Sequence, residues 1–110
     1  MKAGYVYILA SKKNGTLYIG VTSDLLKRIH VHKHDLIDGF TKRYQVHMLI
    51  HYEIFPNIES AIVREKQLKK YERYKKIMLI DKMNPEWNDL YEDVKKNIIG
   101  FPSSTSSRRE

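Results

Sequence analysis

The stretch GYVYILASKKNGTLYIG, residues 4–20, decides the fold, because it predicts two short strands joined by a tight turn. Residues 4–10 and 16–22 are rich in β-branched and aromatic side chains, which favour strands. Between them lies SKKNG, and its Asn14-Gly15 pair is typical of a hairpin turn. The chain therefore begins with a β-hairpin.

The two faces of this hairpin differ in character. Side chains alternate along a strand, and a loop of even length, either residues 14–15 or 12–15, aligns the apolar sets of both strands on one face. That face predicts a core, and its members are Val6, Ile8, Ala10, Leu17, Ile19 and Val21. The other face carries Tyr5, Tyr7 and Leu9 opposite Tyr18, Gly20 and Thr22.

Tyr7 and Tyr18 become diagonal neighbours on the second face if the loop has four residues, with backbones ~7–8 Å apart. Gly20 beside them leaves room for another group to approach. An ordinary aromatic pair across two strands explains the same pattern, so the hairpin alone leaves both interpretations open.

Length, composition and charge limit the class of protein. The chain has 110 residues, enough for one domain, and 42% hydrophobic with 30% charged residues is compatible with a packed core. We find neither a membrane-span run nor a signal-peptide pattern, and therefore expect a cytoplasmic protein with no membrane partner. The absence of cysteine excludes disulfides and thiolate metal sites. A net charge of +7 favours a polyanionic partner, nucleic acid ahead of an anionic membrane.

The rest of the chain predicts the order β-β-α-β-α-α, an α+β fold with helices packed on an antiparallel sheet. After the hairpin we expect a helix over residues 24–36, capped by Ser23 or Asp24, and then a basic loop, GFTKRY, over 39–44. A strand over 46–55 follows and is ended by Pro56-Asn57. Residues 58–82 predict either one long helix or two helices with a break near Tyr74.

Asn84-Pro85 predicts the start of a last short helix, with Asn84 as its N-cap. Trp87, Leu90, Tyr91 and Val94 would then form a docking stripe along this helix, with Trp87 as a packing anchor. We expect one domain over residues 1–97 and a disordered polar tail over 98–110.

Three further residues are candidates for a site. Arg28 and His32 are four residues apart and therefore project from one face of their helix, although a solvated face explains this spacing too. Glu65 lies in the middle of an apolar stripe made by Ile58, Ala61, Ile62 and Leu68. A carboxylate that points towards a core needs a cation, a hydrogen-bond donor or a metal, and an i,i+4 pair with Lys69 is the simplest alternative.

Together these residues resemble the GIY-YIG nuclease family, and in particular its small stand-alone bacterial members. The resemblance rests on Tyr5-Val6-Tyr7, a ten-residue gap, Tyr18-Ile19-Gly20, then Arg28, His32 and a Glu65 within REKQLKK. GFTKRY and NPEWNDLYED are also similar to segments of that group, so that the resemblance covers about residues 4–94. Tyr5 stands where the family name has glycine, a position that varies in the family.

The resemblance implies a three-stranded antiparallel sheet flanked by helices, with a phosphodiesterase site on its tyrosine face. It implies that one divalent ion, Mg²⁺ or Mn²⁺, is held by Glu65, an oxygen ligand suited to either ion. Arg28 would grip the phosphate. Tyr7 would be the general base or orient the water, with its pKa lowered by Arg28 and the metal. Tyr18 would orient water or phosphate, and His32 would accept a proton from a tyrosine or bind the phosphate.

Cations on the second long helix and on the basic loop predict a nucleic-acid surface that contacts the backbone without reading sequence. They are Lys42, Arg43, Arg64, Lys66, Lys69, Lys70 and Arg73. A solvated basic helix is the alternative interpretation. The other histidines form no metal-ligand pattern, and Asn84 is the one late asparagine that could assist the site.

We therefore expect a metal-dependent endonuclease that cuts DNA, structure-selective or weakly specific, in repair or recombination. RNA stays open as a substrate, and a protein partner could supply targeting. The alternatives are a nucleic-acid-binding module of the same fold with little catalysis, and an interaction protein that docks a partner through the helix carrying Trp87.

Overall fold

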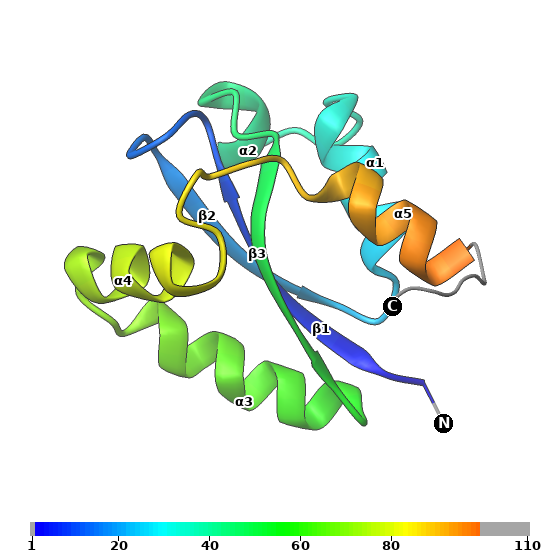
Figure 1. The fold of residues 1–110 in the computed structure, drawn as a ribbon. Coiled ribbons are helices and arrows are strands. Elements are labelled where there is room, and N and C mark those ends of the chain that lie inside the picture. The colour runs from blue at the N-terminus through cyan, green and yellow to red at the C-terminus, as the bar shows by residue number, and fades with distance from the viewer. Residues whose placement is uncertain (1, 100–110) are drawn as a thin grey trace.

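The computed structural model describes residues 2–99, and its centre is a three-stranded antiparallel sheet (Figure 1). The strands are β1 (Gly4–Ala10), β2 (Leu17–Thr22) and β3 (Met48–Phe55), arranged in the order β2-β1-β3. The predicted fold class, an α+β fold with a three-stranded antiparallel sheet and flanking helices, is confirmed. Most of the tail that the sequence predicts to be disordered, residues 100–110, lies outside the described residues.

The β1–β2 hairpin has the four-residue turn that places Tyr7 and Tyr18 on a diagonal. The Ser11 N–H donates to the Thr16 carbonyl at 3.0 Å, and the Gly15 N–H donates to the Lys12 carbonyl at 2.9 Å. In the resulting register Tyr7 pairs with Gly20 and Leu9 pairs with Tyr18. The centroids of the two tyrosine rings are 6.3 Å apart.

Within the described part of the chain, five helices surround the sheet. They are α1 (Leu25–Lys33), α2 (Phe40–Arg43), α3 (Ile58–Lys69), α4 (Arg73–Met83) and α5 (Tyr91–Ile99). Figure 1 shows α3 and α4 on one side of the sheet and α1 and α5 on the other. Asp24 caps α1 by accepting from the Lys27 N–H at 3.2 Å, and Asn57 caps α3 by accepting from the Ser60 N–H at 2.8 Å.

The helix boundaries agree with the sequence prediction only in part. The first helix ends at Lys33 rather than at residue 36, and the expected basic loop contains the single turn α2. Of the two alternatives for residues 58–82, the structure has two helices, and their break at residues 70–72 lies near Tyr74 as expected. The last helix, α5, runs to Ile99, beyond the expected domain boundary at residue 97.

Both faces of the sheet are buried under helices, each with its own hydrophobic core. The first core contains the apolar hairpin face, namely Val6, Ile8, Ala10 and Ile19, together with Ile50, Ala61, Leu68, Ile80 and Trp87. The second core contains Tyr7, Leu9, Leu25, Ile29, Val46, Leu49 and Val94. The second face of the hairpin therefore forms a core of its own, in which Tyr7 is fully buried.

The prediction that Asn84 starts a helix is wrong. Asn84 is buried, and its side-chain amide donates to the carbonyls of Ile50 at 3.0 Å and Asn88 at 2.9 Å. It accepts from the Asn88 N–H at 3.1 Å, so it closes a turn and ties this turn to β3. Trp87 lies inside that turn with φ 54°, which a helix does not allow.

The segment after this turn passes around the outer edge of β3. Trp87 packs in the first core, and its indole N–H donates to Asp81 at 2.7 Å, so the predicted packing anchor is confirmed. The Leu90 N–H then donates to the Leu49 carbonyl at 2.7 Å, and Val94 packs in the second core. The expected docking stripe is thus divided between two cores inside the protein. No helix within residues 2–99 has the length and apolar character needed to cross a bilayer.

Candidate active site

Tyr7 is the centre of the candidate site and is held from two sides. Its hydroxyl lies 3.0 Å from Nε2 of His32, in a buried contact between β1 and α1. Its ring lies over Gly20, where an added Cβ would come within 2.3 Å of the Tyr7 hydroxyl oxygen. The space that Gly20 leaves, which the sequence assigned to an approaching group, is therefore filled by the phenol of Tyr7 itself.

Gly20→Ala is expected to disturb both the fold and the site. The new methyl group would push the Tyr7 ring out of place in a filled core, a change that costs about 1–3 kcal/mol of unfolding free energy. The same movement would break the hydrogen bond to His32 and lower any activity that depends on it. Thermal unfolding and cleavage rates of the variant check this; a variant with unchanged melting temperature and rate would contradict the close packing of Tyr7 on Gly20.

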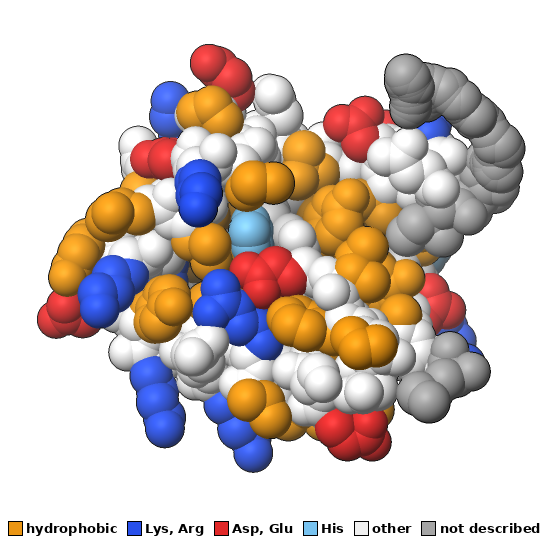
Figure 2. Space-filling model, turned by 60° about the horizontal axis from the view of Figure 1, so that its bottom comes forward, with side chains coloured by type: hydrophobic (Ala, Val, Ile, Leu, Met, Phe, Trp, Pro, Cys, Tyr) orange, Lys and Arg blue, Asp and Glu red, His pale blue; other side chains and the backbone are white. Residues whose placement is uncertain are grey.

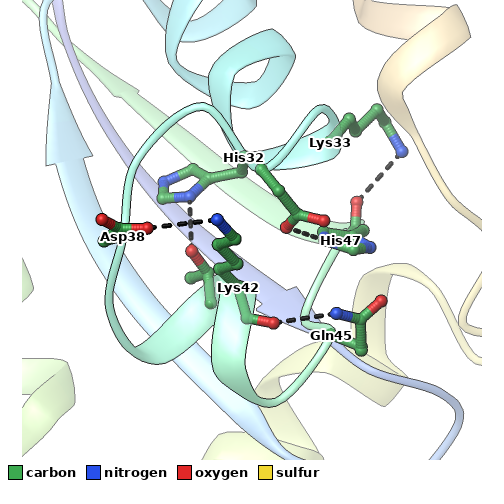
Figure 3. Close-up of polar contacts among 8 residues, drawn as sticks. His32, Lys33, Asp38, Lys42, Gln45 and His47 are labelled. Carbon is green, nitrogen blue, oxygen red and sulfur yellow. Dashed lines mark hydrogen bonds and ion pairs between the residues drawn. The ribbon is translucent and has the colours of Figure 1, made fainter.

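His32 joins Tyr7 to the short helix α2. Its ring is buried, and its Nδ1 lies 3.0 Å from the hydroxyl of Thr41, which is buried as well (Figure 3). Burial, and then the positive charges of Arg28 and His47, lower the pKa of His32 below its usual 6.5. The imidazole is therefore neutral near pH 7, and one ring nitrogen can accept the proton of the tyrosine.

Thr41 is a site residue that the sequence prediction missed. The segment GFTKRY drew attention for its cations, and nothing in its pattern showed that the threonine turns inward. In the structure Thr41 also accepts a backbone hydrogen bond from the Val46 N–H at 2.9 Å. It thereby fixes the turn of α2 against the imidazole of His32.

Tyr18 completes an aromatic group with Tyr7 and His32. Its ring centroid lies 6.3 Å from that of Tyr7 and 5.6 Å from that of His32. Tyr18 is half-buried, whereas Tyr7 is fully buried. Of the two phenols, that of Tyr18 is thus the one more accessible to solvent.

Arg28 and Glu65 lie close enough to Tyr7 for their charges to act on it. Arg28 is exposed on α1 and lowers the pKa of the Tyr7 phenol, while the carboxylate of Glu65 on α3 raises it. Burial is the largest influence, followed by Tyr18, and the net result is a Tyr7 pKa well above 10. The expectation of a lowered pKa is therefore wrong for the protein without a bound ion, because desolvation outweighs Arg28.

Glu65 offers one oxygen donor group at the site. Its side chain is 14% exposed, and Lys69 contacts it at 2.9 Å, the i,i+4 pair that the sequence raised as the alternative to a metal. The described residues contain no group of three or more acidic, histidine or cysteine side chains that could hold a metal. A single carboxylate still fits Mg²⁺ or Mn²⁺, since such ions take their remaining ligands from water and substrate phosphate.

The two arginines of α3 and α4 among the predicted nucleic-acid-binding cations are held by structural partners. Arg64 binds Glu53 on β3 through two contacts, at 2.8 and 3.2 Å, and His51 donates to the same carboxylate at 2.9 Å. This network lowers the pKa of Glu53 to about 2 and makes Arg64 a structural cation. Arg73 donates to the carbonyls at positions 14 and 15, at 2.8 and 2.6 Å, and so holds the hairpin turn.

The remaining predicted cations are exposed. Lys42, Lys66, Lys69 and Lys70 reach solvent, and the guanidinium of Arg43 lies 5.9 Å from the ring centroid of Tyr44. Figure 2 shows that the lower face of the molecule mixes hydrophobic side chains with lysine and arginine rather than presenting a continuous basic field. The structure thus brings together the five predicted catalytic residues but scatters the predicted nucleic-acid-binding ones.

The class of protein follows from comparison of this chain with known families. Residues 3–78 match the GIY-YIG catalytic domain, which is a nuclease domain. The match covers more than half of the chain, and the chain therefore belongs to the GIY-YIG family, as the resemblance in the sequence indicated.

Within this family the chain is similar to UPF0213 proteins. It is 37% identical over 87 residues to one from Syntrophus aciditrophicus, covering 78% of this chain and 98% of the relative. It is 35% identical over 80 residues to one from Staphylococcus saprophyticus, covering 73% and 96%. The solution NMR structure of a UPF0213 protein from Bacillus halodurans superposes with a TM-score of 0.50 and 30% identity, covering 87% of this chain and 97% of the other.

Proposed function

We propose that this protein is a metal-dependent endonuclease that hydrolyses phosphodiester bonds in DNA. The observation that carries the proposal is the hydrogen bond between the Tyr7 hydroxyl and His32, formed where Arg28 and Glu65 also act on that phenol. Such a group supplies a proton acceptor, a phosphate-binding cation and a carboxylate in one place. These are the components that phosphodiester hydrolysis needs.

The neutral imidazole of His32 is positioned to hold the proton that leaves Tyr7. With its own proton on Nδ1, facing Thr41, its Nε2 accepts from the Tyr7 hydroxyl. The raised pKa of Tyr7 keeps the phenol protonated at rest, so a water can lose its proton to Tyr7 only as Tyr7 gives one to His32. In this proposal the pair acts as one acceptor, and His32 takes the proton rather than binding the phosphate.

Arg28 and Glu65 serve the phosphate. Arg28 is exposed, and its planar guanidinium can bind two phosphate oxygens and stabilise their developing charge. Glu65 would hold one Mg²⁺ or Mn²⁺, and its carboxylate would leave Lys69 to do so. When bound, this ion supplies charge neutralisation at the phosphate.

The substrate surface supports weak or structure-selective binding. The net charge of +7 attracts any nucleic acid, and exposed lysines contact the phosphate backbone, which carries no sequence information. We propose DNA forms that arise in repair or recombination in the cytoplasm, with RNA as an open second substrate. A partner protein could supply the targeting that these charges do not.

A cleavage panel tests the proposed function. Labelled single-stranded, duplex, flapped and four-way-branched DNA, with a matched RNA, would be incubated with the protein in Mg²⁺, in Mn²⁺ and in EDTA. We expect cutting of at least one DNA form that stops in EDTA. Binding without cutting across the panel would contradict the proposal and favour a nucleic-acid-binding module. In such a module the ion pair with Lys69 would prevent Glu65 from binding a metal ion.

The cleavage rate is expected to stay constant as the pH falls from neutrality to 6.5 and to decline only below that value. His32 must be neutral to accept a proton, and its pKa is lowered by burial, Arg28 and His47. His47→Gln removes one of these positive charges and should move the decline to higher pH. The free energy of unfolding should also fall below pH 6.5, because the unfolded chain then binds the proton more readily. A decline centred above 6.5 in the unaltered protein would contradict this assignment.

A further inference from the structure

Three aromatic side chains form a continuous row that leads away from the candidate site. We call Tyr18, Phe40 and Tyr44 the aromatic row. The ring centroids of Tyr18 and Phe40 are 6.0 Å apart with their planes at 30°, and those of Phe40 and Tyr44 are 4.8 Å apart. The inner end of the row, Tyr18, also lies against His32 of the site.

The outer two rings of the aromatic row are exposed to solvent. Phe40 is 44% exposed and Tyr44 is 49% exposed. Neither ring belongs to either core. Adjoining aromatic rings held at a surface next to a candidate active site are the arrangement that proteins use to stack nucleobases.

The row is held in place by the same contacts that position the site. Phe40 and Tyr44 flank Thr41, whose buried hydroxyl lies against His32 and whose carbonyl accepts from Val46. Figure 3 shows His32 directed towards the turn of α2 that carries these residues. The distance between the outer rings and Tyr7 is therefore fixed by packing rather than by a free loop.

Hollows with cationic walls lie on both sides of Phe40. One is lined by Tyr18 and Phe40 together with Lys69 and Lys76. The other is lined by Phe40 and Tyr44 together with Lys42 and Arg43, and it also contains Asp35 and Asp38. Lys42 contacts Asp38, whereas the guanidinium of Arg43 lies beside the ring of Tyr44. A strand that stacks its bases on the row would find Lys69 and Lys76 for its phosphates on one side and the guanidinium of Arg43 on the other.

We propose that the aromatic row stacks unpaired nucleobases of the substrate, next to the phosphate that the site attacks. Bases within a duplex already stack on each other and offer no free face, so the row takes single-stranded or flapped nucleic acid. The position of the attacked phosphate rests on the proposed function, whereas the stacking itself does not. Aromatic stacking is indifferent to base identity, which agrees with weak sequence specificity.

A binding experiment in EDTA tests the proposal without any cleavage. Three probes of equal length would be used: a single-stranded DNA oligonucleotide, the same oligonucleotide with abasic positions, and its duplex. The unaltered protein should bind the intact single strand about tenfold or more tightly than the abasic one, the effect expected from losing one base–aromatic stack. Equal affinity for intact and abasic strands would overturn the proposal whatever the variants do.

Phe40→Leu should remove this discrimination. Its affinity for the intact single strand should fall to that for the abasic strand, while duplex binding stays within about twofold. Phe40→Trp should keep the discrimination, which separates stacking from loss of folding. Tyr74→Leu is the matched control, because Tyr74 is an aromatic residue 57% exposed on α4 and outside the row, and it should bind as the unaltered protein does.

The outcomes separate this proposal from the proposed function. Discrimination without cleavage in the panel above would keep the stacking row and reject the nuclease. Cleavage without discrimination would keep the nuclease and reject the row. Loss of binding to anionic lipid vesicles in Phe40→Leu, with binding of the single strand unchanged, would assign the exposed rings to a membrane surface and overturn the proposal.

Discussion

Replacing Glu65 with alanine is expected to lower the cleavage rate at least about a hundredfold, the usual scale for removing one group that organises charge at a reacting phosphate. Glu65 is the candidate ligand for the divalent ion, and its carboxylate acts on Tyr7. Its only described contact is the i,i+4 pair with Lys69, a kind of pair that contributes about 0.3–0.5 kcal/mol at most to folding. Stability should therefore hardly change.

Three measurements on Glu65→Ala separate the chemical role from a structural one. Cleavage under single-turnover conditions gives the rate of the chemical step, thermal unfolding reports the fold, and binding of DNA in EDTA reports the surface. We expect the cleavage rate to fall at least about a hundredfold. The melting temperature and the affinity for DNA should stay close to those of the unaltered protein. Normal cleavage by this variant would reject Glu65 as the metal ligand.

Tyr7→Phe is expected to slow the chemical step about 10²- to 10⁴-fold, the range in which a positioned proton acceptor contributes. In the proposed mechanism the change removes the hydroxyl that would connect the attacking water to His32. It also leaves the Nε2 of a buried imidazole without its partner. That unsatisfied nitrogen should cost about 1–3 kcal/mol of unfolding free energy. Binding of DNA in EDTA should stay within about twofold, since Tyr7 is fully buried.

Tyr52→Phe is the matched control for the loss of a phenol. Tyr52 lies opposite Tyr7 on β3 and packs against the same core, and burial raises its pKa as well. Tyr52 takes no part in the contact with His32, so Tyr52→Phe should keep the cleavage rate of the unaltered protein.

If Tyr7→Phe lost binding and cleavage by the same factor, the role of the Tyr7 hydroxyl would be structural rather than chemical.

The hairpin and the composition of the site could be predicted from the sequence because both depend on local spacing. Alternation of side chains, with an even loop, was enough to place Tyr7 and Tyr18 on one face. The four-residue turn, one of the two loops that the sequence left open, makes them diagonal neighbours. Helical spacing placed Arg28 and His32 on one face of α1. The apolar stripe over residues 58–68 singled out Glu65, and the resemblance to a family then implied its metal. In the structure the carboxylate of Glu65 contributes to the raised pKa of Tyr7.

What the sequence did not show depends on contacts between distant segments. The burial of Tyr7 requires α1 and α5 to cover the second face of the sheet, and the raised pKa follows from that burial. Thr41 turns inward because His32, nine positions earlier, offers it a ring nitrogen. Local patterns carry no information on either contact.

The same reason explains the errors at Asn84 and Arg64. Asn84-Pro85 has the local pattern of a helix start, but Asn84 is held by the carbonyl of Ile50 on β3, and Trp87 turns into the core. Arg64 looks like one of several helix cations, but Glu53 lies opposite it on the sheet. In each case a tertiary partner overrode the local signal.

The central claim is that Tyr7, Tyr18, Arg28, His32 and Glu65 form one metal-dependent phosphodiesterase site. The most direct test is single-turnover cleavage of flapped DNA in Mg²⁺ by the unaltered protein, Glu65→Ala and Lys69→Met, side by side. Lys69→Met breaks the ion pair but leaves the carboxylate in place. The account predicts that Glu65→Ala loses cleavage while Lys69→Met keeps most of it. Equal cleavage by the unaltered protein and Glu65→Ala would contradict a metal-binding role for Glu65. A loss in Lys69→Met that saturating protein restores would instead reflect a lost phosphate contact of Lys69.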